Sequence, residues 1–153
     1  LRALHEKFRE GIVEKNYLAL VLGDWQLGEQ VIDKPLLVTN RKGGERHVVV
    51  SPAGKPAQTR VRLSRTYRDY SLVQCSPLTG RTHQIRVHLQ SVGFPIAGDE
   101  RYGDADANRR LKALGLPRLF LHAQSISFPD EHGNEQHFTA PLSDDLNRFL
   151  AKL

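Results

Sequence analysis

The chain has 153 residues, of which 39% are hydrophobic and 25% charged, and its formal net charge is +5 at pH 7. These values are typical of one globular domain with its own core. No apolar run approaches the roughly 18 residues that a membrane-spanning helix needs, and the first residues lack the apolar centre of a signal peptide. The positive charge favours an anionic partner, most commonly nucleic acid.

A single cysteine, Cys75, excludes an internal disulfide. Its apolar neighbours predict a small buried side chain in a strand rather than a nucleophile. With no sign of a disulfide framework, the expected location is cytoplasmic.

Hydrophobic spacing predicts the following elements in the first half of the chain. Residues 1–10 have helical spacing, and residues 12–22 form a strand with apolar side chains on both faces, which indicates an inner strand. Residues 26–44 show no clear pattern. A short strand is expected at 47–51, and residues 57–65 alternate clearly and are expected to pair antiparallel with 69–75.

In the second half, residues 82–92 are predicted to be a helix because Ile85, Leu89 and Val92 form one apolar stripe. A short helix is expected at 107–114, strands at 119–128 and 136–139, and a final helix capped by Ser143. The last turn of that helix is expected to bury Leu153. Antiparallel runs of strands with a few helices between them indicate an α+β fold.

Residues 78–88 (LTGRTHQIRVH) concentrate hydrogen-bonding side chains after a glycine. Arg81, His83, Arg86 and His88 are candidates for an anion or carboxylate site, since an arginine offers a two-pronged donor. A solvated helix start with scattered charges is the alternative. Arg86 lies within an apolar run, where a charge is generally paired with a carboxylate.

Basic residues gather on the polar face of the strand at 57–65, where Arg60 and Arg62 are suited to phosphate contacts. Further basic residues lie nearby in the sequence: Arg41, Lys42, Arg46, Arg65 and Arg68. An ordinary solvated face is the alternative. The ring of Tyr17, in an inner strand, is expected in the core unless it forms the floor of a pocket and stacks on a base.

Metal sites receive little support from the sequence. His83 and His88 are five positions apart, which does not match the spacing of a zinc helix, and His122 is the only further ligand considered with them. Asp99, Asp104 and Asp106 could be read as a magnesium site, but a solvated turn is the favoured interpretation. We therefore predict no metal site.

Several segments resemble the RluA-type pseudouridine synthase family, and most closely its RluC branch. Residues 15–21 (KNYLALV) and 78–89 (LTGRTHQIRVHL) resemble two signature stretches of that family. Weaker matches follow in the same order at residues 95–99 (PIAGD), 102–103 (YG), 119–123 (LFLHA) and 140–142 (APL). The resemblance spans nearly the whole chain.

The resemblance implies the pseudouridine synthase fold, α+β with a mixed, largely antiparallel sheet and flanking helices. It also implies an isomerase, working without cofactor or metal, that converts specific uridines of large-subunit (23S) ribosomal RNA to pseudouridine. In the family, the nucleophilic aspartate belongs to an Arg-Leu-Asp motif on the N-terminal side of the Lys-x-Tyr segment, and this chain contains no such motif. Residues 1–153 are therefore expected to be the C-terminal part of a catalytic domain. The catalytic-Asp segment and an S4-like domain would lie outside them, leaving the piece inactive alone and an incomplete version of the fold.

The resemblance also assigns roles to residues. Tyr17 matches the tyrosine that stacks on the target base and is placed to move a proton, and Arg86 matches the arginine that pairs with the catalytic aspartate. Arg81, Thr82, His83 and Gln84 are expected to contact the pocket or the RNA. We expect a monomer that binds ribosomal RNA and no membrane. The alternatives are a non-catalytic RNA-binding module and a small-molecule anion binder.

Overall fold

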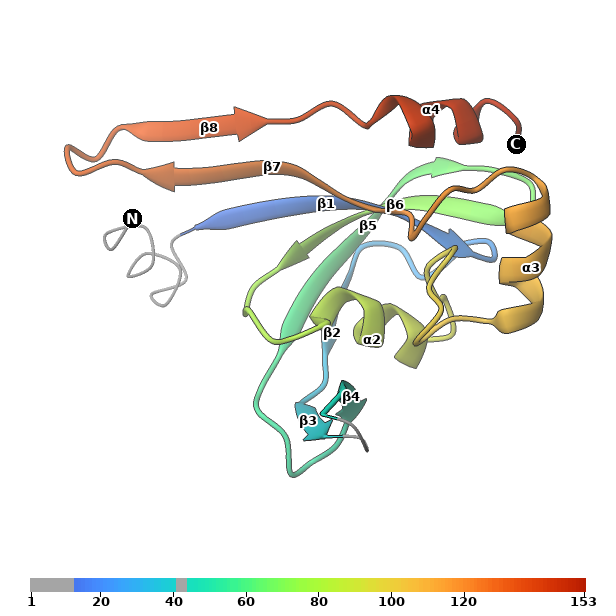
Figure 1. Ribbon diagram of the computed structural model, residues 1–153. Coiled ribbons are helices and arrows are strands. Elements are labelled where there is room, and N and C mark those ends of the chain that lie inside the picture. Colours follow the sequence, from blue (N-terminus) through green and yellow to red (C-terminus); the bar gives the residue numbers. More distant parts are fainter. Residues whose placement is uncertain (1–12, 41–43) are drawn as a thin grey trace.

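The computed structural model describes residues 13–40 and 44–153. Six strands form one sheet in the order β2-β5-β6-β1-β7-β8, and a separate β3–β4 hairpin lies below it (Figure 1). The strands are β1 (Glu14–Leu22), β2 (Gln30–Asp33), β3 (Leu36–Asn40), β4 (Arg46–Val50), β5 (Gln58–Thr66), β6 (Tyr70–Pro77), β7 (Leu121–Pro129) and β8 (Glu135–Thr139). The helices are α2 (Gln84–Ser91), α3 (Ala105–Ala113) and α4 (Asp144–Leu150).

Every pairing between the described strands is antiparallel, which confirms the predicted α+β class. β1 lies between β6 and β7, as its apolar residues on both faces predicted. Ala19, Leu20 and Val21 are fully buried there. Burying a side chain as large as leucine stabilises the fold by about 1.5–3 kcal/mol, so β1 anchors the core. Cys75 is also fully buried, in β6, and burial raises the pKa of its thiol to about 12.

The helices cover this core. α2 runs across one side of the sheet (Figure 1), and its residues Ile85 and Leu89 belong to the main core cluster. Leu111 of α3 and Phe149 of α4 join the same cluster from further along the chain. The stripe predicted for residues 82–92 is thus the buried side of α2. No helix in the described ranges is long and apolar enough to span a bilayer.

Two strands were not predicted. β2 lies at one edge of the sheet, and β3 belongs to the small hairpin. Ile32 is the buried residue of β2 and Leu36 that of β3, so neither strand presents the repeated alternation that the prediction relies on. The strand β5 matches its prediction, except that Leu63 is 42% exposed. The register between β5 and β6 shifts after this residue, between Leu63 and Arg65.

The end of the chain differs from expectation in two details. The hydroxyl of Ser143 makes no capping hydrogen bond to α4; it donates to the side chain of Asp145 and accepts from Nη2 of Arg118 at 2.9 Å. Asp145 in turn accepts the backbone N–H of Leu146. Leu153 is 36% exposed rather than part of the buried stripe, since α4 ends at Leu150. The helix predicted for residues 1–10 lies outside the described residues.

Candidate active site

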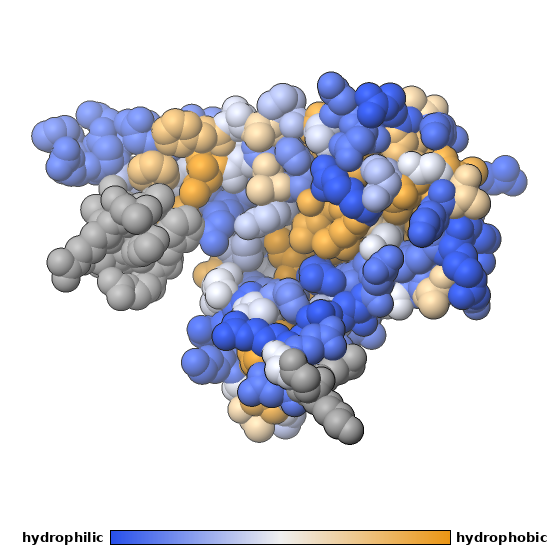
Figure 2. Space-filling model, in the orientation of Figure 1, coloured by the Kyte–Doolittle hydropathy of each residue, from blue (hydrophilic) through white to orange (hydrophobic). Residues whose placement is uncertain are grey.

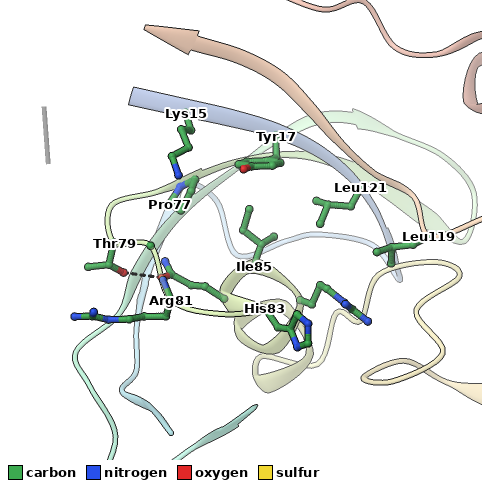
Figure 3. A pocket seen from close by; sticks show the side chains of 12 residues that line it. Lys15, Tyr17, Pro77, Thr79, Arg81, His83, Ile85, Leu119 and Leu121 are labelled. Carbon is green, nitrogen blue, oxygen red and sulfur yellow. Dashed lines mark hydrogen bonds between the residues drawn. The ribbon is translucent and has the colours of Figure 1, made fainter. Parts of the chain in front are cut away.

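A cavity of about 380 Å³ lies between β1, the loop at 77–83 and α2. Figure 3 shows Lys15 and Tyr17 on its β1 side, Ile85 and His83 on the helix side, and Leu119 and Leu121 at one end. Figure 2 shows a hydrophobic area at the centre of this face of the molecule, surrounded by hydrophilic residues. The cavity therefore combines apolar walls with a small number of polar groups, which is typical of ligand sites.

Strand register places Tyr17 in this cavity. Tyr17 lies opposite Cys75 of β6, which lies opposite Val61 of β5, so the three side chains share the face that α2 covers. The tyrosine ring packs against the core cluster and also lines the cavity. Lys15 lines the cavity from the same strand, and burial lowers the pKa of its ammonium group.

His83 precedes α2 rather than belonging to it. Its backbone is left-handed, with φ 52° and ψ 23°, and it is the one described residue other than glycine with a positive φ. Such a conformation costs about 1–3 kcal/mol and is concentrated at functional sites. His83 and Arg86 both line the cavity, although His83 does not belong to the helix that carries Arg86.

His83 is hydrogen-bonded to Tyr102. The Tyr102 hydroxyl oxygen accepts the N–H of Val48 at 3.0 Å and lies 2.8 Å from Nδ1 of His83. The direction of the second bond depends on the tautomer of the imidazole. Burial lowers the pKa of His83, and the positive charges of Arg86 and Arg101 act in the same direction.

Arg86 is held by a carboxylate. Its Nε donates to Asp99 Oδ2 at 2.9 Å and its Nη2 donates to Asp99 Oδ1 at 2.8 Å. Asp99 is 1% exposed, so the interpretation of its loop as a solvated turn was wrong at this position. The sequence predicted a carboxylate partner for Arg86, and in the described structure that partner is Asp99.

The two charges stabilise each other. Burial alone would raise the pKa of Asp99, but the hydrogen bonds from Arg86 and from backbone N–H groups outweigh it and hold the pKa below its ordinary value. The hydrogen bond to Asp99 raises the pKa of Arg86 above its already high ordinary value. Both groups are therefore ionised at neutral pH.

Gln84 lines the cavity, but its side-chain amide is hydrogen-bonded to protein. Its side chain is buried, and its Nε2 donates to the carbonyl of Gln58 at 2.7 Å and to Thr59 Oγ1 at 2.9 Å. Its Oε1 accepts the Thr79 hydroxyl at 2.7 Å and the Arg81 N–H at 3.1 Å. The amide is thus occupied by protein partners, and Gln84 shapes the loop that forms the cavity wall.

Arg81 and Thr82 lie at the entrance of the site. Arg81 is exposed, and its Nε donates to the carbonyl of Pro56 at 3.0 Å. Thr82 lines a second cavity of about 400 Å³, against the β3–β4 hairpin, which shares Gly80 and Arg81 with the first cavity. Both residues are therefore placed to contact a ligand that extends out of the first cavity.

Arg60 and Arg62 are not brought to this cavity. Arg60 lies opposite Ser76 and Arg62 opposite Gln74, so both occupy the sheet face opposite to that of Val61 and Cys75. Both are exposed, and Arg62 donates twice to the side chain of Gln74, at 3.0 and 3.3 Å. They form a separate basic surface. Arg41 and Lys42 lie outside the described residues.

The histidines considered as metal ligands are separated and hydrogen-bonded to protein. His88 is fully buried between Thr59 Oγ1, at 2.8 Å, and the carbonyl of Lys34, at 2.9 Å. His122 bonds the carbonyl of Ala140 at 2.9 Å. In residues 13–40 and 44–153, no three side chains of His, Cys, Asp or Glu are grouped so that they could hold a metal ion.

The sequence did not identify Lys15, Leu119 and Leu121 as cavity residues. Nor did it identify Asp99 as the partner of Arg86, or Tyr102 as the partner of His83. A buried arginine requires a carboxylate, which signals that a partner exists, but the identity of that partner as Asp99 depends on how the loop after α2 folds back. Leu119 and Leu121 gave no such signal, since apolar strand residues are generally read as core.

Comparison with known proteins agrees with this geometry. The family model described as RNA pseudouridylate synthase matches residues 1–91. Ribosomal large subunit pseudouridine synthase C of Haemophilus ducreyi is 54% identical over the whole chain, which covers 48% of that protein. The protein of the same name from Escherichia coli is 48% identical, again over the whole chain and 49% of that protein.

Two solved human structures are also similar. RNA Pseudouridylate Synthase Domain Containing 4 has a TM-score of 0.78 and 26% identity, over 99% of this chain and 66% of that one. RNA Pseudouridylate Synthase Domain Containing 1 has a TM-score of 0.77 and 27% identity, over 90% of this chain and 58% of that one. The chain spans about half the length of the curated relatives it matches. On sequence and fold together, the chain belongs to the RNA pseudouridylate synthase family, in the RluC branch of its RluA-type members.

Proposed function

We propose that this chain is part of an enzyme that isomerises uridine to pseudouridine in ribosomal RNA of the large subunit. The observation that carries the proposal is the shared cavity of Tyr17 and Arg86, which provides an aromatic face and a fixed guanidinium in one partly apolar space. The names of the relatives supply the substrate class.

Tyr17 and the leucines would receive the base. A uridine must leave its stack before chemistry, at a cost of a few kcal/mol. Stacking on an aromatic ring returns about 1–3 kcal/mol per base. The apolar walls of Leu119 and Leu121 keep the cavity partly dry, which strengthens electrostatic interactions inside it.

The reaction breaks the bond between ribose C1′ and uracil N1, turns the base, and joins C1′ to C5, from which a proton is lost. A carboxylate nucleophile suits this chemistry, and it must stay ionised in the cavity, which a neighbouring guanidinium favours. Asp99 does not fit the nucleophile role because both its oxygens already accept hydrogen bonds and it is 1% exposed. We infer that the nucleophilic aspartate comes from polypeptide outside these 153 residues, so that the 153 residues alone are inactive.

RNA outside the cavity would contact two surfaces. Arg81, Thr82 and His83 flank the cavity mouth and suit the nucleotides next to the target. Arg60 and Arg62, on the other face of the sheet, suit more distant phosphates.

The test uses ribosomal RNA labelled with tritium at C5 of uridine, because each isomerisation releases one tritium to water. The uninterrupted polypeptide, meaning the longer protein to which we propose these residues belong, should release tritium. The 153 residues expressed alone should not. If the uninterrupted polypeptide binds RNA but releases no tritium, the result would favour a non-catalytic RNA-binding module. The absence of an Arg-Leu-Asp motif from these residues is also compatible with such a module. Release by the 153 residues alone would contradict the inferred position of the nucleophile.

A further inference from the structure

We infer that Asp99 is a positioning residue: it holds one edge of the Arg86 guanidinium so that the other end faces the Tyr17 cavity and can take a second anion. The inference rests on the proposed function, because the second anion it names is the nucleophilic carboxylate or the RNA. Asp99 would act through Arg86 and never touch the substrate.

The Asp99 carboxylate is fixed by the backbone around it. Its Oδ1 accepts the N–H of Arg101 at 3.0 Å and the N–H of Tyr102 at 2.9 Å, in addition to Arg86. Asn108 holds the same turn by donating to the Asp99 carbonyl at 2.9 Å and accepting the N–H of Gly98, also at 2.9 Å. The carboxylate therefore presents a rigid acceptor to Arg86.

Two glycines allow backbone segments to approach closely at this turn. A Cβ at Gly103 would lie 2.2 Å from the carbonyl oxygen of Asp99, and one at Gly98 would lie 2.8 Å from the carbonyl oxygen of Arg118. Gly98 also has a φ of +81°, which favours glycine. The local sequence is thus built to hold Asp99 in one place.

The guanidinium keeps donors to spare. Of its five N–H groups, Asp99 takes the one on Nε and one on Nη2. Three N–H groups remain, and no other described residue accepts a hydrogen bond from them. Two of the three, one on Nη1 and one on Nη2, form a second pair of parallel donors at the end of the side chain. Arg86 is 20% exposed and lines the cavity. One arginine can therefore bridge a buried carboxylate and an anion in the cavity, which a lysine, as a point charge, cannot do in the same geometry.

Tyr102 completes the support. The guanidinium carbon of Arg86 lies 5.1 Å from the centre of the Tyr102 ring. A carboxylate at one edge and a ring on one face leave the side chain little freedom to rotate. Fixed donors of this kind need no reorganisation when charge develops during a reaction.

The variant Asp99→Asn tests the inference in the uninterrupted polypeptide. Asparagine replaces one carboxylate oxygen with an NH2 group, which would face an N–H donor of Arg86. One of the two hydrogen bonds from Arg86 is then lost, and the guanidinium shifts. A displacement of about 1 Å can cost about 100-fold in rate, so we expect the single-turnover rate of tritium release to fall by about that factor. RNA affinity should stay within about threefold of wild type, because the positive charge remains near the cavity.

A double-variant cycle separates positioning from general damage. In an Arg86→Ala background, Asp99→Asn should change the rate by less than about threefold, because there is no guanidinium left to position. The control Asp104→Asn lies in the same loop region, where its exposed side chain caps α3, and it should leave the rate unchanged.

A spectroscopic readout keeps the inference independent of activity. In nitrogen-15 NMR spectra of the uninterrupted polypeptide, the Nε–H of Arg86 should exchange slowly with water in wild type and at least tenfold faster in Asp99→Asn. If the wild-type protein forms no pseudouridine, the proposed function is refuted. The exchange rate of the Arg86 Nε–H would still decide whether Asp99 positions Arg86. A near-normal rate in Asp99→Asn, or unchanged exchange at Arg86, would overturn the inference.

Discussion

At the scale of single residues, the cavity depends on two side chains whose surroundings differ. Arg86 is fixed by a buried carboxylate, whereas Tyr17 has one face against the core and another toward the cavity. The arginine supplies charge at a defined point, and the tyrosine supplies a flat surface. Their functions can be separated by substitution.

Tyr17→Phe keeps the ring and removes the hydroxyl. If the hydroxyl moves a proton, the rate of tritium release should fall by about 100-fold or more, which is the usual contribution of a positioned acid or base. Affinity for RNA, measured by fluorescence anisotropy, should change by less than about threefold because stacking is retained. A loss of affinity equal to the loss of rate would show that Tyr17 acts in binding alone.

The buried His88 predicts how stability depends on pH. Its Nε2 donates to the carbonyl of Lys34 and its Nδ1 accepts the Thr59 hydroxyl, so the folded protein holds the neutral form. Burial lowers its pKa from the ordinary 6.5. Below pH 6.5 the unfolded chain therefore binds a proton that the folded chain does not, and the free energy of unfolding should decrease as the pH falls.

Urea denaturation between pH 7.5 and 5 measures this effect. The variant His88→Asn should be less stable overall but should show a shallower dependence on pH over that window. Asp99 contributes in a separate window, because its lowered pKa affects stability only as the pH falls below about 3.8. Equal slopes in wild type and His88→Asn would contradict a neutral, buried His88.

The sequence predicted that certain residues require a charged partner, but it did not predict which residue the partner is. An arginine within an apolar run required a carboxylate, and one is present. That this carboxylate is Asp99 could not be read from spacing, because it depends on how the loop after α2 folds back. Gln84 shows the opposite case: a polar residue in a functional motif is buried and supports a loop, a distinction that only its four hydrogen bonds reveal.

At the scale of secondary-structure elements, Tyr102 connects the β3–β4 hairpin to the cavity. Its hydroxyl accepts the Val48 N–H from β4 and bonds His83 at the start of α2. The ring of His47, also in β4, stacks on it with centroids 5.1 Å apart. Tyr102 thus links the hairpin to the cavity wall by hydrogen bonds, alongside the packing of Val87 from α2 against Leu36 and Val48.

Tyr102→Phe should loosen this connection. A buried N–H without its acceptor costs about 1–3 kcal/mol, so the free energy of unfolding should fall by that amount. The Val48 amide should exchange its hydrogen faster, whereas the Nε–H of Arg86 should stay protected because Asp99 is intact. The control Tyr70→Phe removes a hydroxyl that bonds no described residue, and an equal effect of both variants would refute the specific role of Tyr102.

Elements were predictable where the hydrophobic pattern was long. β1 buries four consecutive residues, β5 begins with an alternating pattern and α2 carries an apolar stripe, and all three were predicted. β2 and β3 bury one residue each, so their formation depends on pairing with β5 and β4, which the sequence does not display. The left-handed backbone of His83 also escaped prediction, because helical spacing alone extended the helix to residue 82.

At the scale of the whole molecule, the cavity is assembled from segments far apart in the sequence: β1, the 77–86 region and the start of β7. Sequence reasoning placed Tyr17 and Arg86 together only through the family resemblance. It predicted Arg60 and Arg62 separately, as phosphate contacts on the polar face of their strand, and the register of β5 puts those two side chains on the sheet face opposite to Val61 and Cys75. The face of a strand is fixed only when its partners are known.

This separation predicts two kinds of RNA contact. The logarithm of the affinity for ribosomal RNA should fall steeply with the logarithm of the salt concentration. Replacing both Arg60 and Arg62 with alanine should reduce this slope by the amount expected for about 1–2 phosphate contacts. The rate at saturating RNA should be unaffected, because neither side chain reaches the cavity. Arg110→Ala, on the exposed side of α3, is the matched control and should leave the salt slope unchanged. Equal effects of the two replacements would show that no specific basic surface exists on β5.

The most direct measurement is the single-turnover rate of tritium release by the uninterrupted polypeptide carrying Arg86→Ala, with RNA affinity measured on the same preparation. We expect the rate to fall below that of Asp99→Asn, to a residual level that single-turnover conditions can measure, and the affinity to remain within about threefold of wild type, because Arg86 acts on the reacting groups rather than on the bulk of the RNA. A near-normal rate with Arg86→Ala would show that the cavity shared by Tyr17 and Arg86 is not where uridine reacts.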